Sequence, residues 1–341
     1  MSRSGPDLPY AARRGSARCA AVTSLTTLVA LLASPVAAQE RAASPSELLA
    51  RARSWGYLLQ NVDSPALGRT TYDVLVVDAG SGDGRYGLEP GEVARLKQKP
   101  DSSRRLVIAY MNVGEAEDYR YYWRPAWKSA PPAWMGTANC RWKGDHRVRH
   151  WAAEWQALLF GSKASYLGRL IAAGYDGVYL DRVDIFYHWR ATRWQAAADM
   201  VDFVARLSAW AKKQRPGFLV LPQNGEELLS DPRYLAAIDG IGKEDMLYGD
   251  RGNDVANAPA RILRAERNFA PAIAARLPVF AVEYARRPEH HAEANRHLKE
   301  LGFKIYFAPR SLAYLGQDGP PHPEDGDTET VAAEDDQGSC P

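Results

Sequence analysis

The sequence is poor in the residues that metal, redox and nucleic-acid chemistry require. It has three cysteines and seven histidines among 341 residues, and these form neither a zinc-ligand spacing nor a redox motif. Its 43 basic and 41 acidic residues leave a formal net charge of +2, which provides no field to recruit nucleic acid or an anionic membrane. We therefore expect no nucleic-acid partner and no cofactor, and one large globular domain of ordinary composition.

The amino terminus lacks an apolar run long enough to span a membrane. Its parts follow the order of a signal peptide: Arg13, Arg14 and Arg18, then apolar Ala20 to Ala33, then small residues at Val36-Ala37-Ala38. The apolar part falls short of the roughly 20 residues that a spanning helix needs. We predict a signal peptide over residues 1–38 with cleavage near Ala38, a secreted or periplasmic protein, and no stable membrane anchor. An uncleaved anchor is the alternative.

The cysteines fit that compartment without defining a function. Cys19 would leave with the signal peptide, and Cys140 and Cys340 could pair in an oxidising compartment. Cys340 lies at the end of an acidic segment, and the sequence alone does not bring it to Cys140.

Short β-like runs alternate with helical segments after residue 54, which is typical of parallel α/β architecture. Eight strands are predicted, at Trp55–Gln60, Val74–Asp78, Leu106–Asn112, Gly177–Asp181, Leu219–Gln223, Gly240–Glu244, Val279–Glu283 and Lys304–Ala308. This number and length predict a (β/α)8 TIM barrel over residues 55–316, after a lead-in at 39–54. A doubly wound open sheet is the alternative, but the first strand is not followed by a Gly-rich phosphate turn.

Two regions depart from the alternation. Residues 120–155 contain six tryptophans and three prolines, which predicts a Trp-rich loop inserted after the third strand. Residues 317–341 are acidic, rich in Gly and Pro and nearly free of large apolar groups, which predicts a disordered tail.

Polar residues end nearly every predicted strand, on the face where a TIM barrel carries its active site. They are Asp78, Asn112 with Glu115, Asp181, Gln223 with Asn224, Glu244, Glu283, and Tyr306 with Arg310. Such a set supplies the acid and the nucleophile or base of glycosidic cleavage, because crowding separates the pKa values of neighbouring carboxyls. Carboxylates also bind hard cations, but no histidine joins them in a ligand spacing, so we expect no metal site.

Aromatic residues in the loops suggest a carbohydrate ligand, since sugars present apolar faces ringed by hydroxyls. We expect about half of them to contact substrate and the others to pack the loop. They are Trp123, Trp127, Trp151, Tyr187 and Trp189. Nucleic-acid bases would stack on the same rings but would also need a basic groove.

Four motifs resemble glycoside hydrolase family 114, a group that includes endo-α-1,4-polygalactosaminidases. They are Trp55-Gly56-Tyr57-Leu58-Leu59-Gln60, the run from Tyr72 to Asp78, the run from Ile108 to Arg120, and the run from Gly174 to Asp184. The resemblance covers the chain from Trp55 to Leu315, with its most specific motifs at the third and fourth strands.

The resemblance implies a TIM barrel that cleaves α-1,4-linked galactosamine polymers with two carboxylates. The family's fourth-strand Asp aligns with Asp181, and its Glu after the sixth strand aligns with Glu244, with the adjacent Asp245 as the alternative. Arg182 stands where fungal members have a smaller polar residue, so substrate details are expected to differ. We assign Asp181 as nucleophile and Glu244 as general acid/base, with retention or inversion left open.

The other strand-end residues, together with Trp123 of the loop, are expected to position the polysaccharide substrate. This set is Asp78, Asn112, Glu115, Trp123, Gln223, Asn224, Glu283 and Tyr306. Galactosamine is cationic near neutral pH, so a mouth rich in carboxylates would concentrate it. A non-catalytic polysaccharide-binding barrel and a metal-dependent polysaccharide deacetylase are the two alternative functions.

Overall fold

The computed structural model describes residues 43–80, 88–252 and 254–315. The predicted signal peptide at 1–38 and the predicted tail at 317–341 lie outside these residues. Cys140 forms a disulfide, whereas Cys19 and Cys340 lie outside the described residues.

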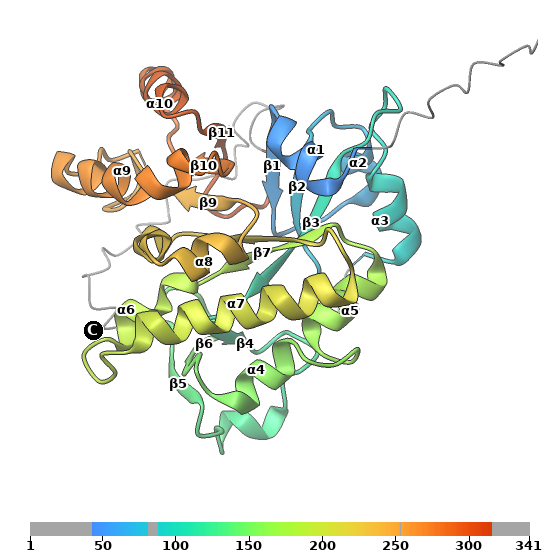
Figure 1. The fold of residues 1–341 in the computed structure, drawn as a ribbon, viewed down its shortest axis with the longest axis vertical. Helices are drawn as coiled ribbons and strands as arrows, with labels where there is room; N and C mark the ends of the chain where they lie inside the picture. Colours follow the sequence, from blue (N-terminus) through green and yellow to red (C-terminus); the bar gives the residue numbers. More distant parts are fainter. Residues whose placement is uncertain (1–42, 81–87, 253, 316–341) are drawn as a thin grey trace, which may run out of the picture. The chain divides into compact units, whose positions relative to one another are not determined.

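The core of the fold consists of eight parallel strands, close to the predicted positions (Figure 1). They are β1 (Trp55–Leu58), β2 (Val74–Asp78), β3 (Leu106–Asn112), β7 (Gly177–Asp181), β8 (Leu219–Pro222), β9 (Ile241–Glu244), β10 (Val279–Glu283) and β11 (Lys304–Phe307). Most of their residues are buried on both faces, because helices cover parallel sheets. The predicted α/β class, with strands and helices in alternation, is confirmed.

The strands form two ladders in chain order. One has the order β1-β2-β3-β7-β8 and the other β11-β10-β9. A single parallel bridge between Gln223 and Gly242 joins β8 to β9. At the other side β1 lies beside β11, where the Trp55 indole donates a hydrogen bond to the Lys304 carbonyl. The order is that of a TIM barrel, but the ladder is not continuous at either of these two junctions.

Helices follow the strands and cover them. The α-helices are α1 (Pro45–Arg51), α2 (Ser64–Gly68), α3 (Pro90–Leu96), α4 (Ala153–Leu159), α5 (Tyr166–Ala173), α6 (Phe186–Trp189), α7 (Ala196–Gln214), α8 (Pro232–Ala237), α9 (Pro259–Ala274) and α10 (Pro288–Glu300). Three short 3-10 helices are η1 (Pro125–Lys128), η2 (Val183–Ile185) and η3 (Glu226–Ser230). No helix within the described residues combines the length and apolarity of a membrane span.

The approach to β7 shows how local sequence sets an element. Ser165 caps α5 by accepting a hydrogen bond from the Gly168 N–H. Gly174 ends the helix with φ of 95°, a left-handed conformation that favours glycine. The chain then enters β7 at Gly177, where a side chain would collide with the Leu219 carbonyl of β8. These residues fix where the strand starts, and therefore that it ends on Asp181.

Aromatic side chains fill the space enclosed by the strands. Trp55 packs against Tyr57, Phe280 and Tyr306, with ring centroids 5.5 to 5.9 Å apart. Tyr57 in turn contacts Tyr179 at 5.2 Å. The cluster forms an apolar floor beneath the strand ends.

The region between β3 and β7 differs from the predicted loop. It contains a three-stranded antiparallel sheet of β4 (Glu115–Glu117), β6 (Asp145–Val148) and β5 (Met135–Ala138), in that order. Its strands are short, and Pro and Gly lie between them, so the sequence shows no long β pattern. Figure 1 shows this insertion sheet with α4, apart from the eight parallel strands.

The interior requires glycine at position 242. A Cβ at Gly242 would lie 1.8 Å from the hydroxyl oxygen of Tyr179, whose ring is fully buried. Overpacking of this kind costs about 1–3 kcal/mol, so we expect Gly242→Ala to lower the free energy of unfolding by about 2 kcal/mol. Gly68→Ala is the matched control, because a Cβ at Gly68 meets nothing within 4 Å. Denaturant unfolding of both variants checks this, and equal loss of stability would contradict it.

Candidate active site

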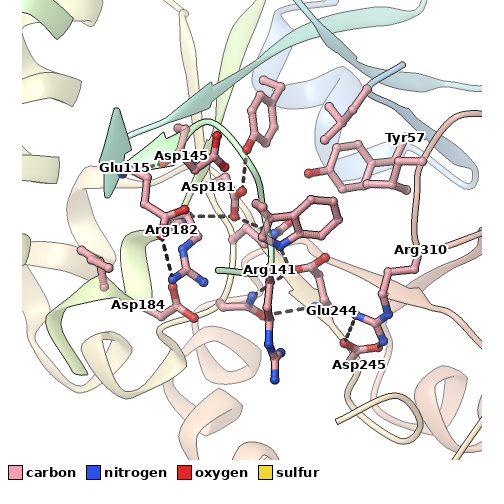
Figure 2. A pocket seen from close by; sticks show the side chains of 18 of the residues that line it. Tyr57, Glu115, Arg141, Asp145, Asp181, Arg182, Asp184, Glu244, Asp245 and Arg310 are labelled. Atoms are coloured by element: carbon pink, nitrogen blue, oxygen red, sulfur yellow. Dashed lines mark hydrogen bonds and ion pairs between the residues drawn. The ribbon is translucent and has the colours of Figure 1, made fainter. Parts of the chain in front are cut away.

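A large pocket opens at the carboxyl ends of the parallel strands. Its volume is about 1330 Å³, enough for more than one sugar unit. Asp181 at the end of β7 and Glu244 at the end of β9 both line it (Figure 2). The pocket is therefore where a parallel α/β fold of this kind places its chemistry.

Three donors hold the Asp181 carboxylate in one orientation. Its Oδ1 accepts hydrogen bonds from the backbone N–H of Arg182 at 2.7 Å and from Gln223 Nε2 at 2.8 Å. Its Oδ2 accepts one from the Tyr110 hydroxyl at 2.6 Å. Two of these donors are side chains of neighbouring strands, so the sheet itself fixes the carboxylate.

Glu244 is held in the same way from the other side. Its Oε1 accepts a hydrogen bond from the Tyr284 hydroxyl at 2.5 Å. Its Oε2 accepts from Gln223 Nε2 at 2.6 Å and from Asn224 Nδ2 at 3.1 Å. The neighbouring Asp245 instead forms a bidentate ion pair with Arg310, at 2.8 and 2.9 Å. The structure thus places Glu244, and not Asp245, beside Asp181.

One amide nitrogen links the two carboxylates. Because Gln223 Nε2 bonds to both, Asp181 Oδ1 and Glu244 Oε2 can be no farther apart than the sum of its 2.8 and 2.6 Å contacts. The limit applies to these two oxygens, and it is compatible with the about 5–5.5 Å between the carboxyl groups of retaining glycosidases.

The closeness of the pair has an electrostatic consequence. Burial in the strand ends, and next the charge of Glu244, raise the pKa of Asp181 to about 7. Two carboxylates so close disfavour double ionisation, so the pair shares one proton near neutral pH. One group is then an acid and the other an anion.

Left-handed backbone follows three successive strand ends. Arg182, Asn224 and Asp245, which follow the ends of β7, β8 and β9, have φ of 59°, 58° and 50°. Such conformations are costly for residues other than glycine and concentrate at functional sites. The Asn224 amide is also oriented, because its Oδ1 accepts from the Glu244 N–H and from Lys243 Nζ. A buried ion pair with Glu226 holds Lys243 in turn.

A tight turn brings the insertion sheet to Asp181. Asn112, at the end of β3, accepts hydrogen bonds from the N–H groups of Gly114 and Glu115. A Cβ at Gly114 would lie 2.2 Å from the Arg182 carbonyl oxygen, so glycine is required for this approach. The Asn112 side chain thus shapes the pocket wall through its hydrogen bonds to the backbone of Gly114 and Glu115.

The insertion sheet separates its side chains onto two faces. Glu115, Glu117, Asp145 and Arg147 all line the pocket, as the two-residue alternation of β4 and β6 requires. His146 points the other way and stacks on Trp123, with ring centroids 4.9 Å apart. Trp123 does not line the pocket.

An ion network ties this sheet to β2. The buried Arg120 binds Asp78 through Nη1 at 2.5 Å and Nη2 at 3.1 Å. The same guanidinium binds Glu117, which also accepts a hydrogen bond from the Tyr119 hydroxyl. Asp78 therefore reaches the pocket wall with an arginine already bound to it.

Two further residues of the predicted site, Glu283 and Tyr306, point into the protein interior and not into the pocket. Glu283 is fully buried and accepts hydrogen bonds from the N–H groups of Met246, Leu247 and Tyr248, so it holds the loop after β9. Burial raises its pKa to about 8. Tyr306 is fully buried in the aromatic cluster. Neither lines the pocket.

Several pocket residues were not among the predicted site residues. Tyr110 shares a face of β3 with Asn112, two positions away, and this alternation is a signal in the sequence. Asp145 carries no such signal, because its strand was not recognised. Trp142 is 44% exposed and lines the pocket, whereas most tryptophans of the insertion are packed. Within the described residues no cluster of three or more His, Cys, Asp or Glu side chains is suited to hold a metal ion.

Comparison with solved structures shows the same fold. The glycoside hydrolase domain of PelA from Pseudomonas aeruginosa superposes with a TM-score of 0.58 at 19% identity, over 78% of this chain and 98% of that one. A variant of that domain with one glutamate replaced by alanine gives 0.57.

Sequence comparison finds related proteins in an archaeon and in bacteria. An uncharacterized protein of Deinococcus radiodurans is 32% identical over 82% of this chain and 88% of its own length. Uncharacterized proteins of Methanocaldococcus jannaschii and Thermotoga maritima are 35% and 34% identical, over 57% of this chain in both cases. The chain spans 56% and 60% of their lengths. The sequence model of glycoside-hydrolase family GH114 matches residues 34–321, and this chain therefore belongs to that family.

Proposed function

We propose that this protein is an extracellular enzyme that cleaves α-1,4-linked galactosamine-type polysaccharide with retention of configuration. Asp181 is the nucleophile and Glu244 the general acid/base. The observation that carries the proposal is the single Gln223 amide that bonds to both carboxylates. Secretion rests on the signal-peptide pattern of residues 1–38.

The first step requires the shared proton on Glu244 and an ionised Asp181, the form that the three hydrogen bonds donated to Asp181 favour. Glu244 protonates the glycosidic oxygen while the Asp181 carboxylate attacks the anomeric carbon, and a glycosyl-enzyme ester forms as the C–O bond breaks. Glu244, now ionised, takes a proton from water, and the resulting hydroxide attacks the anomeric carbon and releases Asp181. Hydrogen bonds from Tyr110, Gln223 and the Arg182 N–H support the negative charge on Asp181 before attack and after release.

The roles follow from how each carboxyl is held. Asp181 has a short side chain fixed partly by backbone, which suits an atom that must meet one carbon accurately. Glu244 is longer and is held by side-chain amides and by Tyr284, which suits a group that must reach the leaving oxygen and later a water molecule.

The side chains that line the pocket indicate the class of substrate. Carboxyl groups from the strand ends and the insertion sheet line the opening together with arginine and lysine side chains, and Tyr119 and Trp142 are exposed there. Aromatic faces suit sugar rings, and carboxyls suit a cationic amino sugar. A polymer of galactosamine offers both.

We expect the losses of activity in Asp181→Asn and Glu244→Gln to be similar on polysaccharide and to differ on an aryl glycoside. On polysaccharide each should lower kcat by roughly 10²–10⁴-fold or more, because each removes an essential group. On an aryl glycoside, whose leaving group needs little protonation, Glu244→Gln should keep much more of its glycosylation rate than Asp181→Asn. Reducing-end and aryl-release assays check this.

Asp202→Asn is the matched control, since Asp202 is exposed on α7 and pairs with the exposed Arg233. It should retain the rate of the unaltered enzyme. Full activity of Asp181→Asn on polysaccharide would refute the assignment, and equal losses for both variants on the aryl glycoside would refute the division of roles.

The raised pKa of Asp181 also predicts a dependence of stability on pH. Its folded value of about 7 lies above the unfolded value of about 3.9, so its contribution to stability is lost as pH rises through that interval. Asn at this position cannot ionise. The Tm of Asp181→Asn relative to the unaltered protein should therefore rise between about pH 4.5 and pH 7.5. The rise should be ~2–4 °C for each kcal/mol of unfolding free energy that the unaltered protein loses when Asp181 ionises.

Differential scanning calorimetry at the two pH values measures this difference. For Asp202→Asn the difference in Tm should stay constant, because Asp202 is exposed. If the Tm difference between Asp181→Asn and the unaltered protein stays constant or falls as pH rises, the ionised Asp181 carboxylate is not destabilised by its surroundings.

A further inference from the structure

The pocket face of the insertion sheet carries three carboxyl groups close together. Antiparallel pairing of β4 with β6 sets Glu117 opposite Asp145 and Glu115 opposite Arg147. Directly opposed residues have Cβ atoms about 4.5–5.5 Å apart, and like charges there repel. Figure 2 shows Glu115 and Asp145 next to Asp181. The same face carries Arg147, and Arg182 forms an ion pair with Glu115, so the face extends the catalytic pair with three carboxyls that lie among basic groups.

The three carboxyls differ in whether their oxygens are satisfied. Both oxygens of Glu117 are occupied by Arg120 and Tyr119. Glu115 Oε1 accepts from Asn139 Nδ2 at 3.0 Å and Arg182 Nη2 at 3.3 Å. Glu115 Oε2 is buried and has no hydrogen-bond partner.

Asp145 is the second incomplete group. It is 8% exposed, and its hydrogen bonds are those of its backbone, with Trp142 and Asn139. Within the described part of the chain its carboxyl has no hydrogen-bond or ion-pair partner. A buried polar atom without a partner, such as Glu115 Oε2, is rare in folded proteins and costly, so it calls for an explanation, whereas Asp145 lines the pocket.

We propose that Glu115 and Asp145 together bind the ammonium group of an amino sugar in the subsite beside Asp181. This inference rests on the proposed function, because the occupant is a unit of the polysaccharide. It goes further in assigning the recognition of the amino group to two residues of the insertion sheet.

An ammonium group fits this place better than a hydroxyl or an acetamido group. It offers three N–H donors and a positive charge that can balance an ionised Asp145, whereas a hydroxyl offers one donor and no charge. An acetamido group also offers one donor, carries no charge and is bulkier than an ammonium group. Recognition should therefore distinguish a free amine from its N-acetylated form.

The electrostatics of Asp145 support the same occupant. Burial, and then the charges of Glu117, Glu115 and Asp181, raise the pKa of Asp145 to about 9. The empty site thus carries a proton on Asp145 at neutral pH. An arriving ammonium takes over the role of that proton in offsetting the neighbouring charges, and the proton leaves to solvent.

The kinetic test compares α-1,4-galactosamine oligomers with their N-acetylated forms. We expect Asp145→Asn to lower kcat/KM for the free amine by ~10–100-fold and for the N-acetylated form by less than about threefold. Glu115→Gln should shift the preference in the same direction. Asp118→Asn is the control, because Asp118 precedes Tyr119 on the same hairpin but does not line the pocket.

A binding test separates this inference from the proposed function. In Asp181→Asn, which blocks turnover, calorimetry of galactosamine oligomer binding at about pH 6 in buffers of different ionisation enthalpy should show release of about one proton. Adding Asp145→Asn should abolish that release. Circular dichroism and Tm of each variant identify any loss of folding.

The outcomes are distinct. No hydrolysis of any oligomer by the unaltered protein would refute the proposed function, while proton release on binding would still support the ammonium site. Hydrolysis combined with equal losses on both substrates for Asp145→Asn and Glu115→Gln, or with no proton release, would overturn the ammonium site and leave the proposed function standing.

Discussion

The site depends on one hydrogen-bonding arrangement, in which Gln223 Nε2 donates to both Asp181 and Glu244. The amide lies at the end of β8, between the strands that carry the two carboxylates, and the single bridge from Gln223 to Gly242 joins the two ladders at the same place. Fold and chemistry are therefore coupled: the junction that brings β8 to β9 also sets how far apart the carboxylates lie. Their closeness leaves one proton between them, which an acid and a nucleophile need.

Strand ends were the most predictable part of this molecule. Parallel strands buried on both faces leave continuous apolar runs in the sequence, and the residues that end those runs meet on one face. Asp181, Glu244 and Gln223 were found in this way. Side-chain direction was not predictable to the same degree. Glu283 ends its strand but turns to hold backbone N–H groups, and Tyr306 lies one residue before the end of β11 and points into the core.

The insertion sheet was beyond prediction for a different reason. Its strands have three or four residues, and their pairing connects segments separated by Trp-rich and Pro-rich turns. Without the pairing, the alternation that puts Asp145 in the pocket and His146 against Trp123 cannot be read. The same alternation gives the enzyme two surfaces: a packed aromatic face that stabilises the insertion, and an acidic face that extends the active site toward the substrate.

We expect the short separation of Asp181 and Glu244 to produce catalysis through a covalent intermediate on Asp181. The most direct test is proton NMR of the products during the first minutes of hydrolysis of an α-1,4-galactosamine oligomer, before the anomers equilibrate. We expect the α-anomer to form first, with the β-anomer appearing later by mutarotation. Initial release of the β-anomer would refute the covalent intermediate, because direct attack by water inverts the anomeric carbon.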